Sequence, residues 1–311
     1  MSLQVLKIGS RGSALALAQA NWVRDRILAC RPHMQAVICV IRTAADTRPD
    51  LPIRDAGSTG VWVREIEQAL LARDVDLAVH SMKDLPTRIP EGLAIGAIPE
   101  REDAHDVLVT RQPVRALSDL RPGSVVGTGS LRRRAQILAA RPDLQVRDIR
   151  GNVDTRLHKL ERGDCDALVL AAAGLRRLGL EDRAALRLEF EEMLPAPGQG
   201  ALALETRSGD PATASLLAAL HHESTAAAVL AERTFLQHVG GGCNSPVAVY
   251  AQPRGDRFSI TGLIAAPDGT RVVRETLAAR AGEAQEIARE LAGALLAHGG
   301  REILRSIGRM P

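Results

Sequence analysis

The chain has 311 residues, roughly two to three times the size of a typical domain, so more than one domain is expected. Its residues are 45% hydrophobic and 25% charged, which is ordinary for a globular protein and excludes a disordered or collagen-like chain. A net charge of +3 and 2% aromatic residues argue against nucleic-acid binding, because excess charge is small and stacking platforms are few.

The sequence shows neither a membrane span nor an export signal. No apolar run reaches the roughly 18 residues that a span needs. The N-terminal segment MSLQVLKIGSRGS is not a charged leader followed by an apolar stretch. The four cysteines are widely spaced, with no CxxC pair and no nearby histidine ligands, so we expect no metal site. These features predict a cytoplasmic protein without membrane contacts.

The first two thirds of the chain are expected to form two similar α/β lobes. In the first lobe, strands are expected at 6–10, 36–42, 77–81 and 92–99, with helices at about 14–30 and 63–74. In the second, strands are expected at 106–110, 125–130, 145–150 and 167–171, with helices at 131–140 and 152–163. Similar strand-to-helix turns, IGSRGSALALAQ and VGTGSLRRRAQI, favour this repetition. A strand at 196–205 would run back from the second lobe. Chain crossings near 99–105 and 195–200 would then make a double hinge beside a cleft.

The last ninety residues predict a small α+β domain with an antiparallel sheet. A helix is expected at 223–239, strands at 246–251, 257–266 and 271–279, and a helix at 282–298. Asp268-Gly269 is a typical hairpin turn between the last two strands. The expected domains are therefore residues 1–100 with 200–219, residues 105–195, and residues 223–311.

Arginines gather where the second lobe's strands pass into helices. Only three of the chain's 40 basic residues are lysines, and residues 128–156 alone carry seven arginines against three aspartates. Arg132, Arg133 and Arg134 stand in a first helical turn, where cations oppose the helix dipole. A bound anion would receive their guanidinium groups and the hydroxyls of Thr128 and Ser130. The alternative is an ordinary solvated basic helix face.

Other basic residues occupy comparable positions. Arg150 and Arg156 flank the next strand-to-helix passage, and Arg11 with Ser13 occupies the equivalent place in the first lobe. Ligands of α/β sheets bind at the carboxyl ends of strands. The two lobes are therefore expected to bind a ligand with several carboxylates or phosphates.

The segment His80-Ser81-Met82-Lys83-Asp84 follows a predicted strand directly. Lys83 is one of the few lysines in a chain that otherwise uses arginine. A carboxylate such as Asp84, placed among cations at a cleft, could stabilise a developing cation or move a proton. The alternative is an ordinary surface turn.

Cys243 follows three glycines, which permit positive φ angles and close approach of other groups. This thiol is therefore a candidate nucleophile or attachment point. Cys30, Cys39 and Cys165 stand in helical or strand contexts and are expected in the core.

Several of these segments together resemble one enzyme family. GSRGSALALAQ, HSMKDLP, GTGSLRRRAQ, RGNVDTRL, AAAGLRRLG, LPAPGQGAL and GGCNSPV follow each other in the order and spacing of the porphobilinogen deaminases (hydroxymethylbilane synthases). The resemblance spans roughly residues 6–250, and the C-terminal sixty residues match weakly.

The resemblance implies a fold of two lobes like those of periplasmic binding proteins, and a transferase activity in porphyrin and heme biosynthesis. The family joins four porphobilinogen molecules head to tail with loss of ammonia and releases hydroxymethylbilane. The chain grows on dipyrromethane, a cofactor held through a thioether by the cysteine that matches Cys243. Asp84 matches the catalytic carboxylate. Arginines that match Arg11, Arg132, Arg133, Arg150, Arg156 and Arg177 hold acetate and propionate groups, and further contacts match Ser13, Ser81, Lys83, Thr128, Ser130 and Gln199.

The sequence also departs from the family. The glycine-rich loop that usually reads close to GKGLF is Ser58-Thr59-Gly60-Val61-Trp62, so the lid aromatic is Trp62 and the lysine is missing. Thr43-Ala44-Ala45-Asp46 lacks a glycine often found before the aspartate, and Gly129 stands where serine is common.

Two other functions fit parts of the pattern. A two-lobed protein could bind a small polyanion without chemistry, although Cys243 in an added third domain argues against this. The arginines could bind nucleic acid, although the mixed charge and scarce aromatics argue against that too. The sequence has no heptad repeat or long apolar stripe that would indicate a partner chain, so a monomer that acts on a small molecule is expected.

Overall fold

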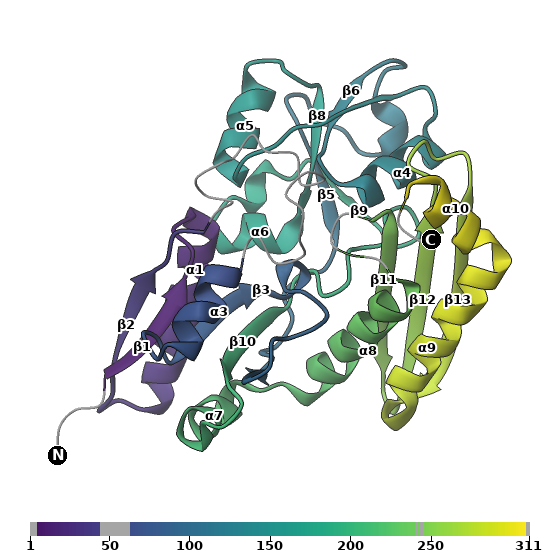
Figure 1. Cartoon of the computed structure of the whole chain (residues 1–311). Helices are drawn as coiled ribbons and strands as arrows, with labels where there is room; N and C mark the ends of the chain where they lie inside the picture. Colours follow the sequence, from purple (N-terminus) through teal and green to yellow (C-terminus); the bar gives the residue numbers. More distant parts are fainter. Residues whose placement is uncertain (1–4, 44–62, 241, 243–244, 309–311) are drawn as a thin grey trace. The chain divides into compact units, whose positions relative to one another are not determined.

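The computed structural model describes residues 5–43, 63–240, 242 and 245–308 (Figure 1). The chain forms two compact units, the first from residues 1–102 and 201–226 and the second from residues 103–200 and 227–311. The predicted C-terminal domain thus shares a compact unit with the second lobe, and the three-domain division stays a prediction. None of the helices within the described residues is long and apolar enough to cross a membrane.

The first unit is built on a five-stranded mixed sheet. In spatial order its strands are β2 (Gln35–Val40), β1 (Val5–Ser10), β3 (Leu77–Ser81), β10 (Leu202–Arg207) and β4 (Leu93–Ala97). Strand β1 is parallel to β2 and β3, whereas β10 is antiparallel to both of its neighbours. Its helices are α1 (Ala14–Cys30), α3 (Arg64–Leu71) and α7 (Pro211–Leu217).

The central strands of this sheet are buried on both faces, whereas Val37 and Val40 of the edge strand β2 are 46% and 55% exposed. Leu77 and Leu204 pack with Ile27 of α1 on one side, and Ala78 packs with Ile66 of α3 on the other. Because successive strand residues point to opposite faces, a strand covered on both sides reads as a continuous apolar run. This explains why apolar runs predicted the central strands. The run at 36–42 predicts a buried strand as well, and that burial is wrong, because β2 is an edge strand.

The second unit contains a five-stranded sheet with the same pattern. In spatial order its strands are β7 (Gln145–Arg147), β6 (Val125–Gly127), β8 (Ala167–Ala171), β5 (Asp106–Thr110) and β9 (Leu186–Leu188). Its helices are α4 (Leu131–Ala140), α5 (Val153–Glu161) and α6 (Ala172–Arg177). In each sheet the antiparallel fourth strand begins just after the chain has entered that unit, β5 after residue 103 and β10 after residue 201. The expectation of two similar α/β lobes is confirmed.

The C-terminal part is a three-stranded antiparallel sheet with helices. Its strands are β11 (Val247–Arg254), β12 (Arg257–Ala265) and β13 (Val272–Arg280), and its helices are α8 (Glu223–Val239), α9 (Ala284–Leu295) and α10 (Arg301–Ser306). One sheet face packs on α8, α9 and α10, with Phe235, Ile260 and Leu291 fully buried among them (Figure 1). On the other face Leu263 packs with Ala135 of α4. The expected α+β domain with an antiparallel sheet is confirmed.

Some local expectations are wrong. The helix expected at 282–298 breaks near its expected end, since His298 and Gly299 have non-helical backbone angles and Gly299 takes a φ of 108°, but the helix α10 that follows directly is not among the expected elements. Residues 196–201 are not part of a strand, which begins at Leu202. Cys165 is buried as expected, whereas Cys30 is exposed because the buried stripe of α1 ends at Ile27.

Candidate active site

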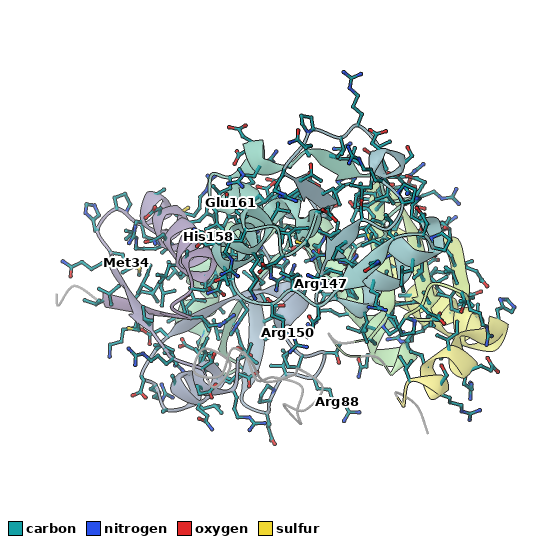
Figure 2. All side chains as sticks on the ribbon, turned by 90° about the horizontal axis from the view of Figure 1, so that it is seen from above. Met34, Arg88, Arg147, Arg150, His158 and Glu161 are labelled. Atoms are coloured by element: carbon teal, nitrogen blue, oxygen red, sulfur yellow. The ribbon has the colours of Figure 1, made fainter. Side chains whose placement is uncertain are left out.

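Several predicted site residues follow the carboxyl ends of parallel strands. In the first unit β1 and β3 are parallel neighbours, so Arg11 after β1 and Asp84 after β3 follow the same sheet edge. In the second unit β7, β6 and β8 are parallel, and Arg150, Thr128 and Arg177 come after them in the chain. Figure 2 labels Arg150 among the side chains of this unit. Ligands of α/β sheets bind at such edges.

In the first unit, hydrogen bonds hold the segment that contains Asp84. Gln19 of α1 donates to the hydroxyl of Ser81 over 2.9 Å. The Met82 amide donates to the carbonyl of Ala201 over 3.0 Å, and Met82–Asp84 forms a single 3₁₀ turn. This turn keeps Lys83 and Asp84 partly buried, and the Met82 side chain anchors it in the core.

Ser13 has a structural role in this unit. It is the N-cap of α1, and its hydroxyl accepts the amide of Ala16 over 3.3 Å. N-cap hydroxyls satisfy one of the free amide groups of the first helical turn. Arg11, just before it, is partly buried in the loop between β1 and α1.

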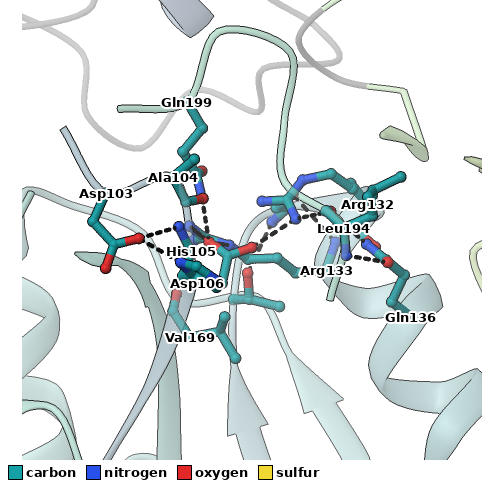
Figure 3. Close-up of polar contacts among 12 residues, drawn as sticks. Asp103, Ala104, His105, Asp106, Arg132, Arg133, Gln136, Val169, Leu194 and Gln199 are labelled. Atoms are coloured by element: carbon teal, nitrogen blue, oxygen red, sulfur yellow. Dashed lines mark hydrogen bonds and ion pairs between the residues drawn. The ribbon is translucent and has the colours of Figure 1, made fainter. Parts of the chain in front are cut away.

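In the second unit, two of the predicted ligand-binding arginines are internal. Arg132 and Arg133 are 4% and 6% exposed, and both contact the fully buried carboxylate of Asp106 (Figure 3). Nη1 of Arg132 lies 2.6 Å from Oδ2, while Nε and Nη2 of Arg133 lie 3.1 and 2.7 Å from Oδ1. Gln199 donates to the same Oδ1 over 2.9 Å. The solvated helix face is therefore the wrong description of these two arginines.

The cluster of Asp106, Arg132, Arg133 and Gln199 carries a net positive charge. Burial alone would raise the pKa of Asp106, but the two guanidinium groups hold it well below its usual range. Burial lowers the pKa of Arg132, and the charge of Arg133 adds to this, whereas Asp106 opposes it. One carboxylate between two guanidinium groups leaves an excess positive charge that favours an anion nearby.

The remaining predicted residues of the second unit also make internal hydrogen bonds. Ser130 is the N-cap of α4, and its hydroxyl accepts the amide of Arg133 over 3.4 Å. The hydroxyl of Thr128 accepts the amide of Ser130 over 3.2 Å. Arg156 and Arg177 donate to the carbonyls of Gly151 and Gly200, both over 2.7 Å. These bonds fix the side chains at the sheet edge.

Gly129 lies close to an acidic side chain. A Cβ at this position would lie 2.9 Å from Oδ1 of Asp148. Asp148 in turn lies 2.8 Å from the guanidinium of Arg150. Arg150 therefore has an exposed carboxylate neighbour from its own chain, with which any ligand carboxylate competes.

Two of the predicted site residues, Cys243 and Trp62, lie outside the described residues. The other residues of the segment 44–62 lie outside them too. The structure brings Arg132, Arg133 and Gln199 together around Asp106, and it joins Ser81 to α1. The predicted residues of the first unit and those of the second belong to separate compact units. The cleft and the double hinge stay predictions.

Sequence reasoning missed the acidic residues that organise these side chains. In the sequence Asp106 is the first residue of an expected strand, and a lone carboxylate that opens an apolar run is itself a signal. Glu232 of α8 is fully buried and accepts the amides of Gly198 and Ala251 over 2.7 and 2.9 Å. It thereby ties the turn that carries Gln199 to strand β11.

Comparisons with known proteins place the whole chain in a family. Residues 6–215 match the family described as "Porphobilinogen deaminase, dipyromethane cofactor binding domain", and residues 226–297 match "Porphobilinogen deaminase, C-terminal domain". A porphobilinogen deaminase of Thermus thermophilus is 48% identical over 306 residues, which are 98% of this chain and 100% of that protein. One of Pelobacter propionicus is 46% identical over 302 residues, 97% of each chain.

A solved structure of a TRAP periplasmic solute binding protein from Desulfovibrio salexigens has a TM-score of 0.44 and 12% identity, covering 72% of this chain and 74% of that one. The two family matches and the full-length similarity to these enzymes lead to one conclusion. The chain belongs to the porphobilinogen deaminase family.

Proposed function

We propose that this chain joins porphobilinogen units with Asp84 as the catalytic carboxylate, on a dipyrromethane cofactor attached to Cys243. The observation that carries the activity is family membership, based on matches over residues 6–215 and 226–297. Family members of this kind are deaminating transferases of tetrapyrrole biosynthesis, and the N-terminal part of this chain is a dipyrromethane-binding domain. The roles of individual residues rest on the arguments that follow.

Asp84 carries the negative charge that the reaction needs, on a backbone segment that is held in place. Loss of ammonia from porphobilinogen leaves a cationic pyrrole, which a carboxylate stabilises if it is held in place beforehand. The 3₁₀ turn after β3, the buried Met82 and the bonded Ser81 fix the backbone around Asp84. The same carboxylate can accept a hydrogen bond from the incoming pyrrole nitrogen and so orient it.

The donor groups at the sheet edges fit a cofactor and a substrate that carry carboxylates. When bound, dipyrromethane supplies the pyrrole carbon to which new units are added. Arg11, Arg150, Arg156 and Arg177 provide guanidinium groups for its acetate and propionate oxygens, and Lys83 adds an ammonium group. Arg132 and Arg133 are buried against Asp106, and the excess positive charge of this cluster attracts the carboxylates of the cofactor and substrate.

The proposal is tested by single-turnover ammonia release from cofactor-loaded protein. Asp84→Asn keeps the size of the side chain and removes its charge, and we expect the rate to fall by about a hundredfold or more. Asp84→Glu keeps the charge in a shifted position and should retain part of the activity. Glu91→Gln, an exposed acid of the same unit, is the matched control. Equal rates for the wild type and Asp84→Asn would remove Asp84 from the mechanism.

We also propose a cytoplasmic monomer. Sedimentation at several protein concentrations tests the monomer, and fractionation of cells tests the location. Binding of porphobilinogen without ammonia release by the loaded wild type would instead support a non-catalytic polyanion-binding protein.

A further inference from the structure

One lysine of the second unit is not used in the site described above. Lys159 on α5 is one of only three lysines among the 40 basic residues of the chain. Its ammonium nitrogen Nζ donates a hydrogen bond to the backbone carbonyl of Arg150 over 3.1 Å, across nine residues of sequence. Arg150 is one of the arginines proposed above to bind the carboxylates of the cofactor and the substrate. Lys159 therefore contacts the backbone of a proposed ligand-binding residue.

The loop between β7 and α5 is attached to α5 at three successive residues. Ile149 is 4% exposed and packs among leucines of α5. The carbonyl of Arg150 accepts the hydrogen bond from Lys159, and the carbonyl of Gly151 accepts one from Nε of Arg156 over 2.7 Å. Helical side chains lean toward the N-terminus of their helix, so these two basic side chains reach back to the loop that precedes it. Each residue from 149 to 151 is thus fixed by a side chain of α5.

The backbone of this loop lies directly on the first turn of α5. Gly151 has a φ of 112°, and a Cβ at this position would lie 2.7 Å from Cγ2 of Thr155. A side chain at position 151 would therefore have to displace the loop or the helix. Because Gly151 lies this close to α5, the hydrogen bond from Lys159 fixes the direction in which the side chain of Arg150 leaves the backbone.

The side chain of Arg150 makes an ion pair that a ligand carboxylate can replace. Its Nε and Nη2 both lie 2.8 Å from Oδ2 of Asp148, and the Asp148 side chain is 51% exposed. Exposed ion pairs of this kind contribute little free energy. After such an exchange the loop backbone still holds the base of the Arg150 side chain in place, which lowers the entropy cost of binding.

We propose that Lys159 is a positioning residue for the ligand-binding guanidinium of Arg150. Its ammonium group holds the Arg150 carbonyl from α5, so that the guanidinium meets a ligand carboxylate without first being ordered. A charged donor makes a stronger hydrogen bond than a neutral one and adds positive charge beside the anion. This role rests on the proposed function of Arg150 as a ligand of the cofactor and substrate carboxylates.

The rate of cofactor loading measures this role on the full chain. Cofactor-free protein is incubated with porphobilinogen, and the mass gained as dipyrromethane is followed by intact mass spectrometry. Lys159→Met keeps the aliphatic stem and removes the ammonium group, and we expect loading about fivefold slower, the factor that one hydrogen bond typically contributes. Lys159→Arg keeps a charged donor and should recover part of the rate.

The matched control is Arg162→Met, which removes the same charge from the end of α5. The Arg162 side chain is 69% exposed and pairs with Asp164 instead of the loop. Arg162→Met should load at the wild-type rate. Loading by Lys159→Met at the rate of this control would overturn the proposal.

A double-mutant cycle separates positioning from direct binding, since an ammonium group has further donors that could bind the ligand itself. If Lys159 acts through Arg150, adding Lys159→Met to Arg150→Leu should slow loading no further. A further fivefold loss in the double variant would show that Lys159 acts independently of Arg150, and it would overturn the positioning role.

Hydrogen exchange of the cofactor-free chain gives a readout that does not depend on the ligand. Peptides that cover residues 148–153 should exchange faster in Lys159→Met than in the wild type and in Arg162→Met, because the loop loses one of its three attachments. Unchanged exchange would overturn the proposal. If exchange rises while Arg150→Leu loads at the wild-type rate, the hold of Lys159 on the loop stands and the proposed ligand role of Arg150 fails.

Discussion

Replacement of Asp106 by asparagine tests whether the buried charges of the second unit depend on one carboxylate. Asp106 is fully buried and accepts hydrogen bonds from Arg132, Arg133 and Gln199 at 2.6 to 3.1 Å. An asparagine keeps one acceptor oxygen but turns an NH₂ group toward donors, and it leaves two buried guanidinium groups without a counter-ion. Removing one partner of a buried ion pair typically costs about 3–5 kcal/mol, and we expect Asp106→Asn to lose that much stability.

The stability loss of Asp106→Asn should depend on pH in a direction that the pKa of Asp106 sets. The pKa of Asp106 is lowered in the folded chain, because the guanidinium groups outweigh the effect of burial. A lowered carboxyl pKa stabilises the fold above the unfolded pKa of about 3.9, and this stabilisation is lost as the pH falls through the folded pKa. The deficit of Asp106→Asn should therefore be complete at neutral pH and shrink below about pH 4.

Urea unfolding followed by circular dichroism, with hydrogen exchange of peptides from α4 and β5, measures the effect in the second unit. The matched control is Asp143→Asn, since Asp143 lies 2.6 Å from Arg141 in an ion pair that is far more exposed. This control should change stability little, because solvent screens exposed pairs. If Asp106→Asn unfolds like the wild type and its α4 peptides keep their protection, the cluster does not stabilise the unit and the reasoning fails.

Three further predictions concern the site and its support. Cys243→Ser should fold but carry no covalent pyrrole, and an intact mass that still includes dipyrromethane would place the attachment elsewhere. Arg150→Leu should load less cofactor at unchanged thermal stability, whereas Asp148→Asn, which removes the competing carboxylate at 2.8 Å, should load at least as well as the wild type by intact mass. Gly269→Ala should lower the stability of the second unit in urea, because the new Cβ would overlap the backbone of α4 and Gly269 has a φ of 76°. Gly255 has a similar φ of 64° but open space around it, so Gly255→Ala should lower the stability less.

The central strands of the lobes could be predicted from sequence because they are covered on both faces. The apolar run Ala167–Ala171 has no polar residue to interrupt it, and the small residues after β6 mark a strand-to-helix turn. The helix α10 after the break at Gly299 was not predictable in the same way, because two glycines after a helical pattern ordinarily end the helix. Here α10 begins directly after them, and buried Ile303 and Leu304 pack it into the C-terminal core.

The inner contacts of the site could not be predicted, because they join residues far apart in the chain. Asp106 and Arg132 are 26 residues apart, and His80 and Glu205 are 125 apart. A run of arginines on a helix normally indicates a solvated face, and only the packing of α4 against β5 and Leu194 shows that two of them are internal. Substitution of Arg132 is therefore expected to lower stability as well as anion binding, since it would leave Asp106 with one guanidinium.

Each unit has one buried acid on the corresponding strand of its sheet. Asp106 opens β5 and Glu205 lies within β10, and each of these is the antiparallel fourth strand that follows entry of the chain into its unit. Both acids contact basic side chains that belong to, or immediately precede, the predicted site residues. Buried ion pairs are weak stabilisers, because apolar side chains of similar volume would often give an equally stable core. Stability alone therefore does not explain the two acids, whereas a need to hold polar groups at the strand ends does. Asp106 and Glu205 lie on β5 and β10, the strands that follow entry of the chain into each unit. A substitution of either acid is therefore expected to change both the geometry of the site residues that it holds and the stability of its unit.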